Sequence, residues 1–269
     1  MTNELVFLKL GGSLITDKNT PHTARRRVIR RLANEIKQGL TDWSQTSLVL
    51  GHGSGSFGHT PASKYGTRSG VRTQAEWLGF VEVWKEARAL NQIVMEECLD
   101  AGLPVIAFPP SATILTAGKK VIKTSDRIIK SALQAGLIPV VFGDVVFDQE
   151  LGGTILSTEE VFAGLAGFLS PVRILLAGLE RGVYQDFTNH KKIIKVITPE
   201  SYKILNTHAG ASASTDVTGG MAKKVESMIQ LISRYSKLSV QIFSGVHPGT
   251  LTKAIQGGYP GTKICYTLK

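Results

Sequence analysis

The 269-residue sequence predicts an α/β fold in which a largely parallel sheet is covered by helices on both faces. Apolar, β-rich runs alternate with helical stretches along most of the chain, a pattern typical of parallel sheets. A hydrophobic share of 42% is enough to build a full core. The first two apolar runs lead directly into glycine-rich loops, which are suited to contact phosphate groups.

The expected strands are short runs rich in branched aliphatic residues, at 5–10, 47–50, 104–108, 137–142, 172–177 and 239–243. The expected helices cover 24–38, 74–101, 126–135, 157–167 and 219–233. Two hairpins are predicted, one over 113–123 with Gly118 at its turn and one over 145–155 with Gly152-Gly153 at its turn.

The predicted helix over 74–101 carries large apolar side chains at three- and four-residue spacing, so one of its faces is strongly apolar. Its N-terminal half is rich in aromatic residues. We expect Phe80, Val81 or Trp84 to line an apolar pocket, with plain core packing as the alternative.

The chain lacks the sequence signs of secretion or of a membrane span. Its first apolar run is short and interrupted by Lys9, and the longest later run is broken by Pro139 and Asp144. Cys98 and Cys265 lie far apart and offer neither a disulfide framework nor a CxxC metal site. We therefore expect a soluble cytoplasmic protein with no membrane partner.

A net charge of +10 predicts attraction to polyanions or to phosphorylated small molecules. The densest basic run, 25–31, lies on a predicted helix and has no interleaved aromatic residues. We interpret it as a solvated helix face and expect no nucleic-acid partner, with a basic nucleic-acid-binding protein as the distant alternative.

The two glycine loops are Lys9-Leu-Gly-Gly-Ser13 and His52-Gly-Ser-Gly-Ser-Phe-Gly-His59. Glycine allows successive backbone N–H groups to converge on an anion, and a helix beginning near Phe57 would add its positive N-terminal end. Two such loops suggest two phosphates, one on a donor and one on an acceptor. Residues 53–60 also approach the P-loop pattern, but His59 replaces its lysine, which makes a degenerate P-loop a poor fit.

Other residues point to phosphoryl transfer, which needs positioned cations and N–H donors more than a nucleophile or a metal triad. Lys9 precedes the first glycine loop, Lys18 follows it, and Lys224 lies one turn into the last long predicted helix. Gly143-Asp144 follows another strand.

Together with Asp216-Val-Thr-Gly-Gly-Met-Ala-Lys-Lys224, these motifs resemble those of the amino acid kinase superfamily and, within it, the isopentenyl phosphate kinases. Lys64-Tyr65-Gly66 and Phe108-Pro-Pro-Ser-Ala112 are similar to the same group. The resemblance implies an open αβα sandwich with one continuous sheet, commonly a homodimer. It places acceptor binding in residues 1–170 and ATP binding in residues 171–269.

The implied reaction is ATP- and Mg²⁺-dependent phosphorylation of isopentenyl phosphate to isopentenyl diphosphate, and the alternative is a phosphotransferase similar to fosfomycin kinase. The resemblance implies catalytic roles for Lys9, Lys18, His59 and Lys224, and no metal ligands. It implies acceptor contacts from Ser54, Gly55, Gly58, His59, Gly143 and Asp144. It implies nucleotide contacts from Lys9, Gly11, Gly12, Ser13, Gly55, Gly182, Gly220 and Lys224. Residues 176–184 depart from the family pattern, because the aspartates that relatives carry there are absent.

Overall fold

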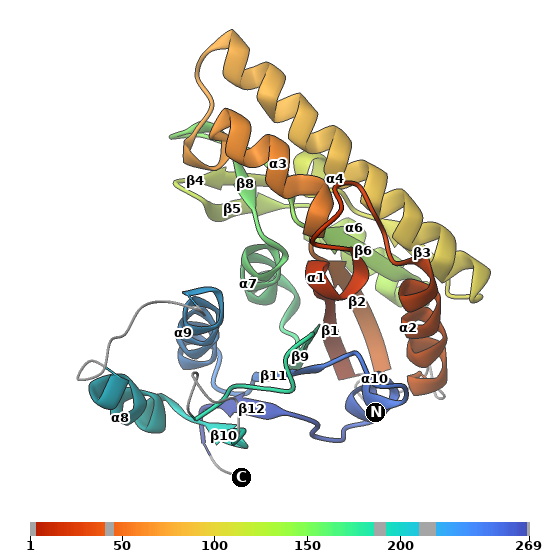
Figure 1. Cartoon of the computed structure of the whole chain (residues 1–269), viewed down its shortest axis with the longest axis vertical. Helices are drawn as coiled ribbons and strands as arrows, with labels where there is room; N and C mark the ends of the chain where they lie inside the picture. The colour runs from red at the N-terminus through yellow and green to blue at the C-terminus, as the bar shows by residue number, and fades with distance from the viewer. Residues whose placement is uncertain (1–3, 41–45, 186–191, 210–218, 268–269) are drawn as a thin grey trace.

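The structure is a computed structural model that describes residues 4–40, 46–185, 192–209 and 219–267; the side chains of residues 59–61, 63 and 205–209 lie outside this description. Eight strands of the described residues form one central sheet (Figure 1). In spatial order they are β10 (Val196–Ile197), β12 (Thr262–Cys265), β11 (Ser239–Ser244), β9 (Arg173–Gly178), β1 (Glu4–Leu10), β2 (Thr46–His52), β6 (Ile138–Phe142) and β3 (Val105–Ala107). All neighbours are parallel except β11 and β12. The predicted α/β class and mostly parallel sheet are confirmed.

The strands of the central sheet send side chains into a core on each face. In β1, Val6, Leu8 and Leu10 enter one core and Phe7 enters the other, because successive side chains of a strand point to opposite faces. Helices α2 (Arg26–Gly39), α4 (Gln74–Asp100) and α10 (Thr250–Ile255) pack into the first core. Helices α6 (Asp126–Gln134), α7 (Thr158–Leu169) and α9 (Gly219–Arg234) pack into the second. The sheet is therefore the middle layer of an αβα sandwich.

A smaller sheet lies beside the N-terminal part of α4, with the strand order β5-β4-β7-β8. Its strands are β4 (Ile114–Ala117), β5 (Lys120–Thr124), β7 (Asp144–Asp148) and β8 (Gly152–Leu156). The β4–β5 hairpin turns at Gly118 as predicted, with a φ of 53° at Gly118 and 67° at Lys119. Positive φ at both central residues is the signature of the two-residue turn that matches strand twist.

The predicted turn at Gly152-Gly153 is wrong, because both glycines lie in β8 and the chain turns through residues 149–151. The Asp148 carboxylate shapes that turn by accepting the N–H groups of Glu150 and Leu151. A glycine is needed at position 153 of this strand, because a Cβ there would come 2.9 Å from the Phe80 ring. Gly153 thus allows close packing against α4, whereas Gly152 allows close approach of the Val71 carbonyl, 2.1 Å from the position of a Cβ.

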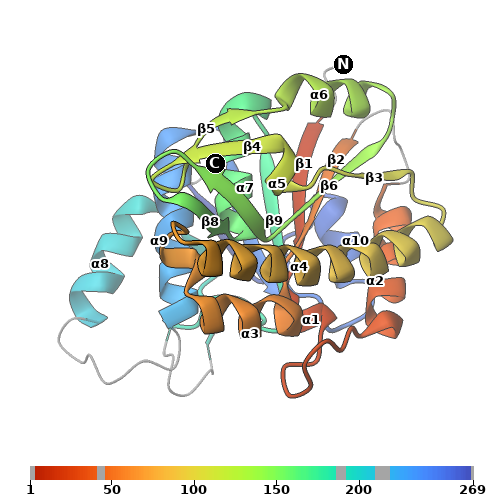
Figure 2. The same cartoon turned by 90° about the horizontal axis from the view of Figure 1, so that it is seen from above.

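Helix α3 (Gly55–Tyr65) begins two residues before the expected Phe57 and lies alongside α4 (Figure 2). A capping box between Thr73 and Glu76 fixes the start of α4. The six predicted strands and five predicted helices are all present. The sequence pattern missed mainly short elements: α1 (Gly12–Ile15), the 3₁₀ turn Thr67–Ser69, α5 (Pro110–Thr113), α8 (Pro199–Ala209), α10, β10 and β12. In the part of the chain that the structure describes, no helix is long and apolar enough to cross a membrane.

Candidate active site

The carboxyl ends of five central strands meet at one edge of the sheet. The register pairs Leu10 of β1 with His52 of β2 and with Ala177 of β9, and extends to Phe142 and Phe243. Loops after parallel strands are where open α/β sheets bind ligands. A cleft of about 890 Å³ opens at this edge.

The cleft collects most of the residues that the sequence pointed to, from both ends of the chain. The predicted residues that line it are Lys9, Gly11, Gly12, Ser13, Lys18, Ser54, Gly55, Gly58, Gly143, Gly220 and Lys224. Asp144 and Gly182 do not line it. The backbone of His59 lies in α3, but its side chain is outside the described residues, as is the whole of residues 216–218.

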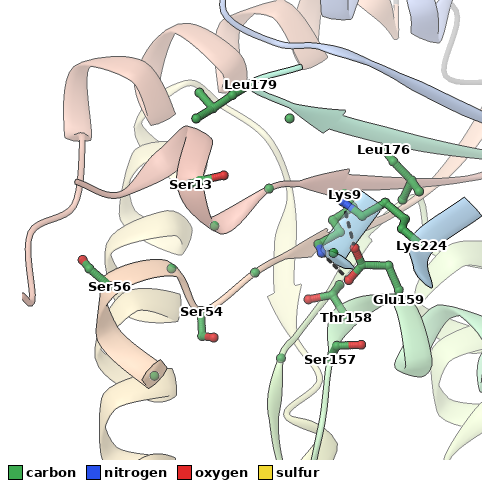
Figure 3. A pocket seen from close by; sticks show the side chains of 18 of the residues that line it. Lys9, Ser13, Ser54, Ser56, Ser157, Thr158, Glu159, Leu176, Leu179 and Lys224 are labelled. Atoms are coloured by element: carbon green, nitrogen blue, oxygen red, sulfur yellow. Dashed lines mark hydrogen bonds and ion pairs between the residues drawn. The ribbon is translucent and has the colours of Figure 1, made fainter. Parts of the chain in front are cut away.

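Two of the predicted lysines meet at a carboxylate that the sequence analysis did not single out (Figure 3). Lys9, near the end of β1, donates a hydrogen bond from its Nζ to the Glu159 carboxylate, and the Lys224 Nζ of α9 lies 3.5 Å from Glu159 Oε1. Glu159 is the second residue of α7, in the helix's first turn. The three side chains form a charged cluster at the centre of the cleft.

The protonation states within this cluster depend on its charges. Burial lowers the pKa of Lys9, and the nearby Lys224 charge adds to this effect, whereas Glu159 opposes it. Burial by itself would raise the pKa of Glu159, but the charges of Lys9 and Lys224 outweigh that effect and lower this pKa to about 2. Glu159 is therefore ionised at neutral pH, which favours the charged form of Lys9.

The two glycine loops pack directly on each other, and this contact leaves no room for side chains. A Cβ at Gly12 would lie 2.4 Å from the Gly55 nitrogen, and a Cβ at Gly53 would lie 2.7 Å from the Gly12 nitrogen. Gly55 has a φ of +51°, which is unfavourable for other residues. Thr16 locks the contact, since its hydroxyl donates to the Gly12 carbonyl and accepts the Ser56 N–H.

Asp144 and Gly182 have structural surroundings outside the cleft. Asp144 is buried and its carboxylate accepts the N–H groups of Ser111 and Val145. Burial raises the pKa of Asp144 to about 6 even though these hydrogen bonds favour the charged form. Gly182 packs on the Thr262 hydroxyl, which accepts the Val183 N–H. The contacts to substrate or nucleotide expected of Asp144 and Gly182 stay predictions.

One end of the cleft is apolar, and α4 contributes to it with residues other than those expected. Its walls are Ala62, Val83, Ala87 and Ile155. Phe80, Val81 and Trp84, which were expected to line it, are not among its walls: Phe80 packs with Val83 in a small core cluster, and Val81 and Trp84 are 52% and 37% exposed. The pocket uses the smaller residues of α4 because bulky ones fill the core beside it.

The cleft is also lined by three residues at the start of α7 that were not among the predicted site residues: Ser157, Thr158 and Glu159. A signal for them exists in the sequence. Ser157 and Glu160 form a capping box, in which each side chain accepts the other residue's N–H. Serine followed three residues later by glutamate predicts a helix start, and this start directly follows a strand, as the other site loops do.

The sequence profile of the amino acid kinase family matches residues 4–244. An isopentenyl phosphate kinase from Methanocaldococcus jannaschii is 33% identical over 272 residues, which cover 98% of this chain and 99% of the relative. An isopentenyl phosphate kinase from Methanothermobacter thermautotrophicus is 32% identical, with 97% and 98% coverage.

The fold is similar to that of solved isopentenyl phosphate kinases. One X-ray structure superposes with a TM-score of 0.81 at 28% identity, covering 97% of this chain and all of the other. A UMP kinase from Ureaplasma parvum, at 13% identity and a TM-score of 0.66 over 98% of this chain, shares the fold alone. The chain belongs to the amino acid kinase family, because the family profile covers most of its length and a 33% identical relative aligns with nearly all of it.

Proposed function

We propose that this protein transfers the γ-phosphoryl group of ATP to isopentenyl phosphate, giving isopentenyl diphosphate and ADP. The observation that carries the proposal is a single cleft with a cationic, glycine-lined centre and an apolar end. The centre suits two phosphate groups, and the apolar walls at Ala62, Val83, Ala87 and Ile155 suit a short hydrocarbon tail.

In this reaction an oxygen of the acceptor phosphate forms a bond to the γ-phosphorus while the bond between that phosphorus and the β,γ-bridging oxygen breaks. Charge spreads over the moving phosphoryl oxygens, so fixed cations and N–H donors are the groups that stabilise the transition state. Lys9 and Lys224 supply the cations, and the Glu159 carboxylate holds them near each other against their mutual repulsion. A phosphate acceptor is already ionised near neutral pH and needs no general base.

We assign the acceptor to the half of the cleft formed by residues 1–170 and ATP to the half formed by residues 171–269. The apolar walls come from α3, α4 and β8 in the first half, whereas Gly220 and Met221 lie at the opposite side, in the second half. Lys18, which lines the cleft and is exposed on the loop before α2, is assigned to the transferring group. His59 is assigned to the acceptor phosphate as a hydrogen-bond donor.

We infer that Mg²⁺ enters with ATP on its phosphate oxygens. Among the described residues, no group of three His, Cys, Asp or Glu side chains could hold a metal ion, and the Glu159 carboxylate is paired with two lysines. The ion would neutralise phosphate charge as the two anions approach. A homodimer is inferred from the resemblance to the family, and light scattering on the purified protein tests it. A cytoplasmic location is inferred from the sequence, which shows no sign of secretion or of a membrane span.

An ADP-release assay with Mg·ATP tests the proposal against a panel of isopentenyl phosphate, dimethylallyl phosphate, fosfomycin, N-acetylglutamate and UMP. Isopentenyl phosphate is expected to give the highest kcat/KM, and omission of Mg²⁺ to abolish turnover. A preference for fosfomycin or for the carboxylate would overturn the assignment. Absence of turnover with every acceptor, together with tight phosphate binding, would instead indicate a phosphate sensor, and salt-sensitive retention on nucleic acid would support the basic binding protein.

A further inference from the structure

His52, the last residue of β2, lies between the sheet and the second glycine loop and has no part in the mechanism above. Its side chain is buried, with 1% of the residue exposed. Nδ1 lies 3.2 Å from the carbonyl oxygen of Gly53, and Nε2 lies 3.1 Å from Oδ1 of Asn91 on α4. The ring stacks on Phe142 with centroids 5.2 Å apart.

The backbone of His52 joins two more walls of the cleft. Its carbonyl accepts a 2.6 Å hydrogen bond from the Thr158 hydroxyl, next to Glu159, and the N–H of Gly143 at 3.2 Å. One residue therefore contacts β6, the start of α7, α4 and the glycine loop, which together surround the cleft.

Asn91 continues the face of α4 that lines the cleft. Val83, Ala87 and Asn91 are spaced four residues apart and so lie along one side of the helix. Val83 and Ala87 form part of the apolar end, and Asn91, 7% exposed, follows them toward His52. The same side of α4 thus faces the acceptor's tail and, through His52, reaches the loop beside the acceptor's phosphate.

A neutral imidazole satisfies both contacts in only one arrangement. Burial, with a smaller contribution from the Lys9 charge, lowers the pKa of His52 to about 4 although the two hydrogen bonds oppose this shift, so the ring carries one N–H at neutral pH. If Nδ1–H donates to the Gly53 carbonyl, Nε2 must accept. The amide of Asn91 then turns its N–H₂ toward the ring, an exchange of amide oxygen and nitrogen that leaves the positions of the heavy atoms nearly unchanged.

The fixed Gly53 carbonyl determines which N–H groups of the loop face the ligand. The N–H groups of Gly53 and Ser56 are occupied by the Leu10 carbonyl and the Thr16 hydroxyl. Those of Ser54 and Gly55, both on the cleft wall, have no partner within the described residues. They are the free donors for an anion at this point.

We infer that His52 and Asn91 are positioning residues: through the Gly53 carbonyl they hold the peptide groups of Ser54 and Gly55 in the orientation that binds the acceptor's phosphate. This inference rests on the proposed function for the identity of the acceptor. The geometry of the loop itself can be measured without it.

Three substitutions separate positioning from simple packing. His52→Asn keeps an amide N–H close to the place of Nδ1, whereas His52→Gln extends its amide toward Asn91 and loses the donor to Gly53. Asn91→Leu keeps the volume and removes the polar partner. Cys98→Ala is the matched control for loss of helix packing, because Cys98 is buried two turns beyond Asn91 on the same side of α4 and does not line the cleft.

We expect His52→Gln and Asn91→Leu to lower kcat/KM for isopentenyl phosphate by roughly tenfold or more, because small misplacements of binding groups are costly. The KM for ATP should change by less than about twofold, and His52→Asn should recover part of the loss. The inference would be overturned if His52→Asn and His52→Gln lowered kcat/KM for isopentenyl phosphate equally. It would also be overturned if the variants lowered kcat/KM for ATP as much as kcat/KM for isopentenyl phosphate.

Hydrogen exchange of a peptide covering residues 53–58, in the protein without substrates, gives a second readout. Exchange should be faster in His52→Gln and Asn91→Leu and unchanged in Cys98→Ala. If the wild-type enzyme fails to phosphorylate isopentenyl phosphate but this pattern is found, the proposed function is wrong and the positioning role stands. If exchange is the same in all variants, the positioning role is wrong whatever the substrate.

Discussion

Glu159 places a carboxylate between two lysine ammonium groups that belong to opposite halves of the chain. A carboxylate in this position has two effects: it orients both ammonium groups, and it favours the protonated form of Lys9. In the transfer step itself the cations act on the phosphates, so Glu159 contributes through Lys9 and Lys224.

We expect Glu159→Gln to lower kcat by roughly 10- to 100-fold, since the two lysines would then repel each other in a buried site. The basic limb of the pH–rate profile should also shift to lower pH in this variant. Glu159 raises the pKa of Lys9, and without it only burial and the Lys224 charge act on Lys9, both of which lower that pKa. Glu160→Gln is the matched control, since glutamine preserves the capping box. An equal loss in both variants would contradict this role.

Asp144 makes a contribution to stability that depends on pH. Its pKa is raised from 3.8 to about 6 in the folded protein, mainly by burial. A raised pKa means that the stabilising contribution is fully present below about pH 3.8 and is lost as pH rises through about 6. Ionisation of a buried carboxyl group is thus a cost at neutral pH.

Asp144→Asn should remove this dependence. The difference in unfolding free energy between variant and wild type should move in favour of the variant from pH 4 to pH 7, by up to about 3 kcal/mol. Asparagine has one acceptor fewer for the N–H groups of Ser111 and Val145, which adds a cost that does not vary with pH. Urea unfolding across this range measures the change, and parallel curves for the two proteins would refute the assignment.

The two glycine loops act as one structural element, because each occupies the space where the other would need side chains. A Cβ added to Gly12 would press on the backbone of Gly55, which cannot move without disturbing Thr16. The loops that hold the two phosphates are therefore fixed relative to each other by contact.

Gly12→Ala should lower the free energy of unfolding by about 1–3 kcal/mol, as overpacking does, and reduce kcat strongly. Gly178→Ala is the control for stability, since a Cβ at Gly178 would meet no atom within 4 Å. Thermal and urea unfolding of both variants test the prediction. Similar stability of Gly12→Ala and wild type would show that the loops can separate at little cost.

Helix α4 sets the length of the apolar end through the side chains on its inner face. Val83→Ala and Ile155→Ala should raise kcat/KM for a ten-carbon prenyl phosphate relative to isopentenyl phosphate by about tenfold, because an apolar pocket rejects longer homologues by volume. Val81→Ala, on the exposed side of the same helix, should leave this ratio unchanged. A gain in the Val81 variant alone would contradict the assignment of Val83 and Ile155 to the pocket and would support the expectation that Val81 lines it.

At the scale of the whole molecule, strands from before and after residue 170 share one sheet and meet at the β1–β9 pair. The cleft lies across this junction, so the proposed donor and acceptor would bind to one rigid layer. The net charge of +10 surrounds this cleft with a field that attracts phosphorylated ligands.

We therefore expect kcat/KM for isopentenyl phosphate to fall several-fold as KCl rises from about 0.05 to about 0.5 M, because salt screens long-range attraction. Sucrose at matching osmolality should have little effect. Steady-state kinetics at a fixed concentration of Mg·ATP make the comparison, and a rate that does not depend on salt would exclude steering by the overall charge.

Local sequence signals were sufficient for the main strands and helices, the two glycine loops, and Lys9 and Lys224 as members of one cleft. These signals are local: a few consecutive residues show the periodicity of a strand or helix, the composition of a glycine-rich loop, and whether a residue follows a strand. The order of the parallel strands then brings those stretches to one edge.

Contacts across the fold decided the rest. Glu159 forms an ion pair with Lys9 although 150 positions separate them in the sequence, and the residues near Glu159 give no indication of this partner. The apolar pattern of α4 showed that one side is buried, but the segments packed against this helix decided that Val83 and Ala87 line the cleft and that Phe80 does not. In the same way the Asp148 carboxylate accepts N–H groups from two loops and so fixes the hairpin turn before Gly152, where the sequence pattern had not predicted it. Sequence specifies what each segment can do, whereas side-chain partners and available volume are properties of the packed chain.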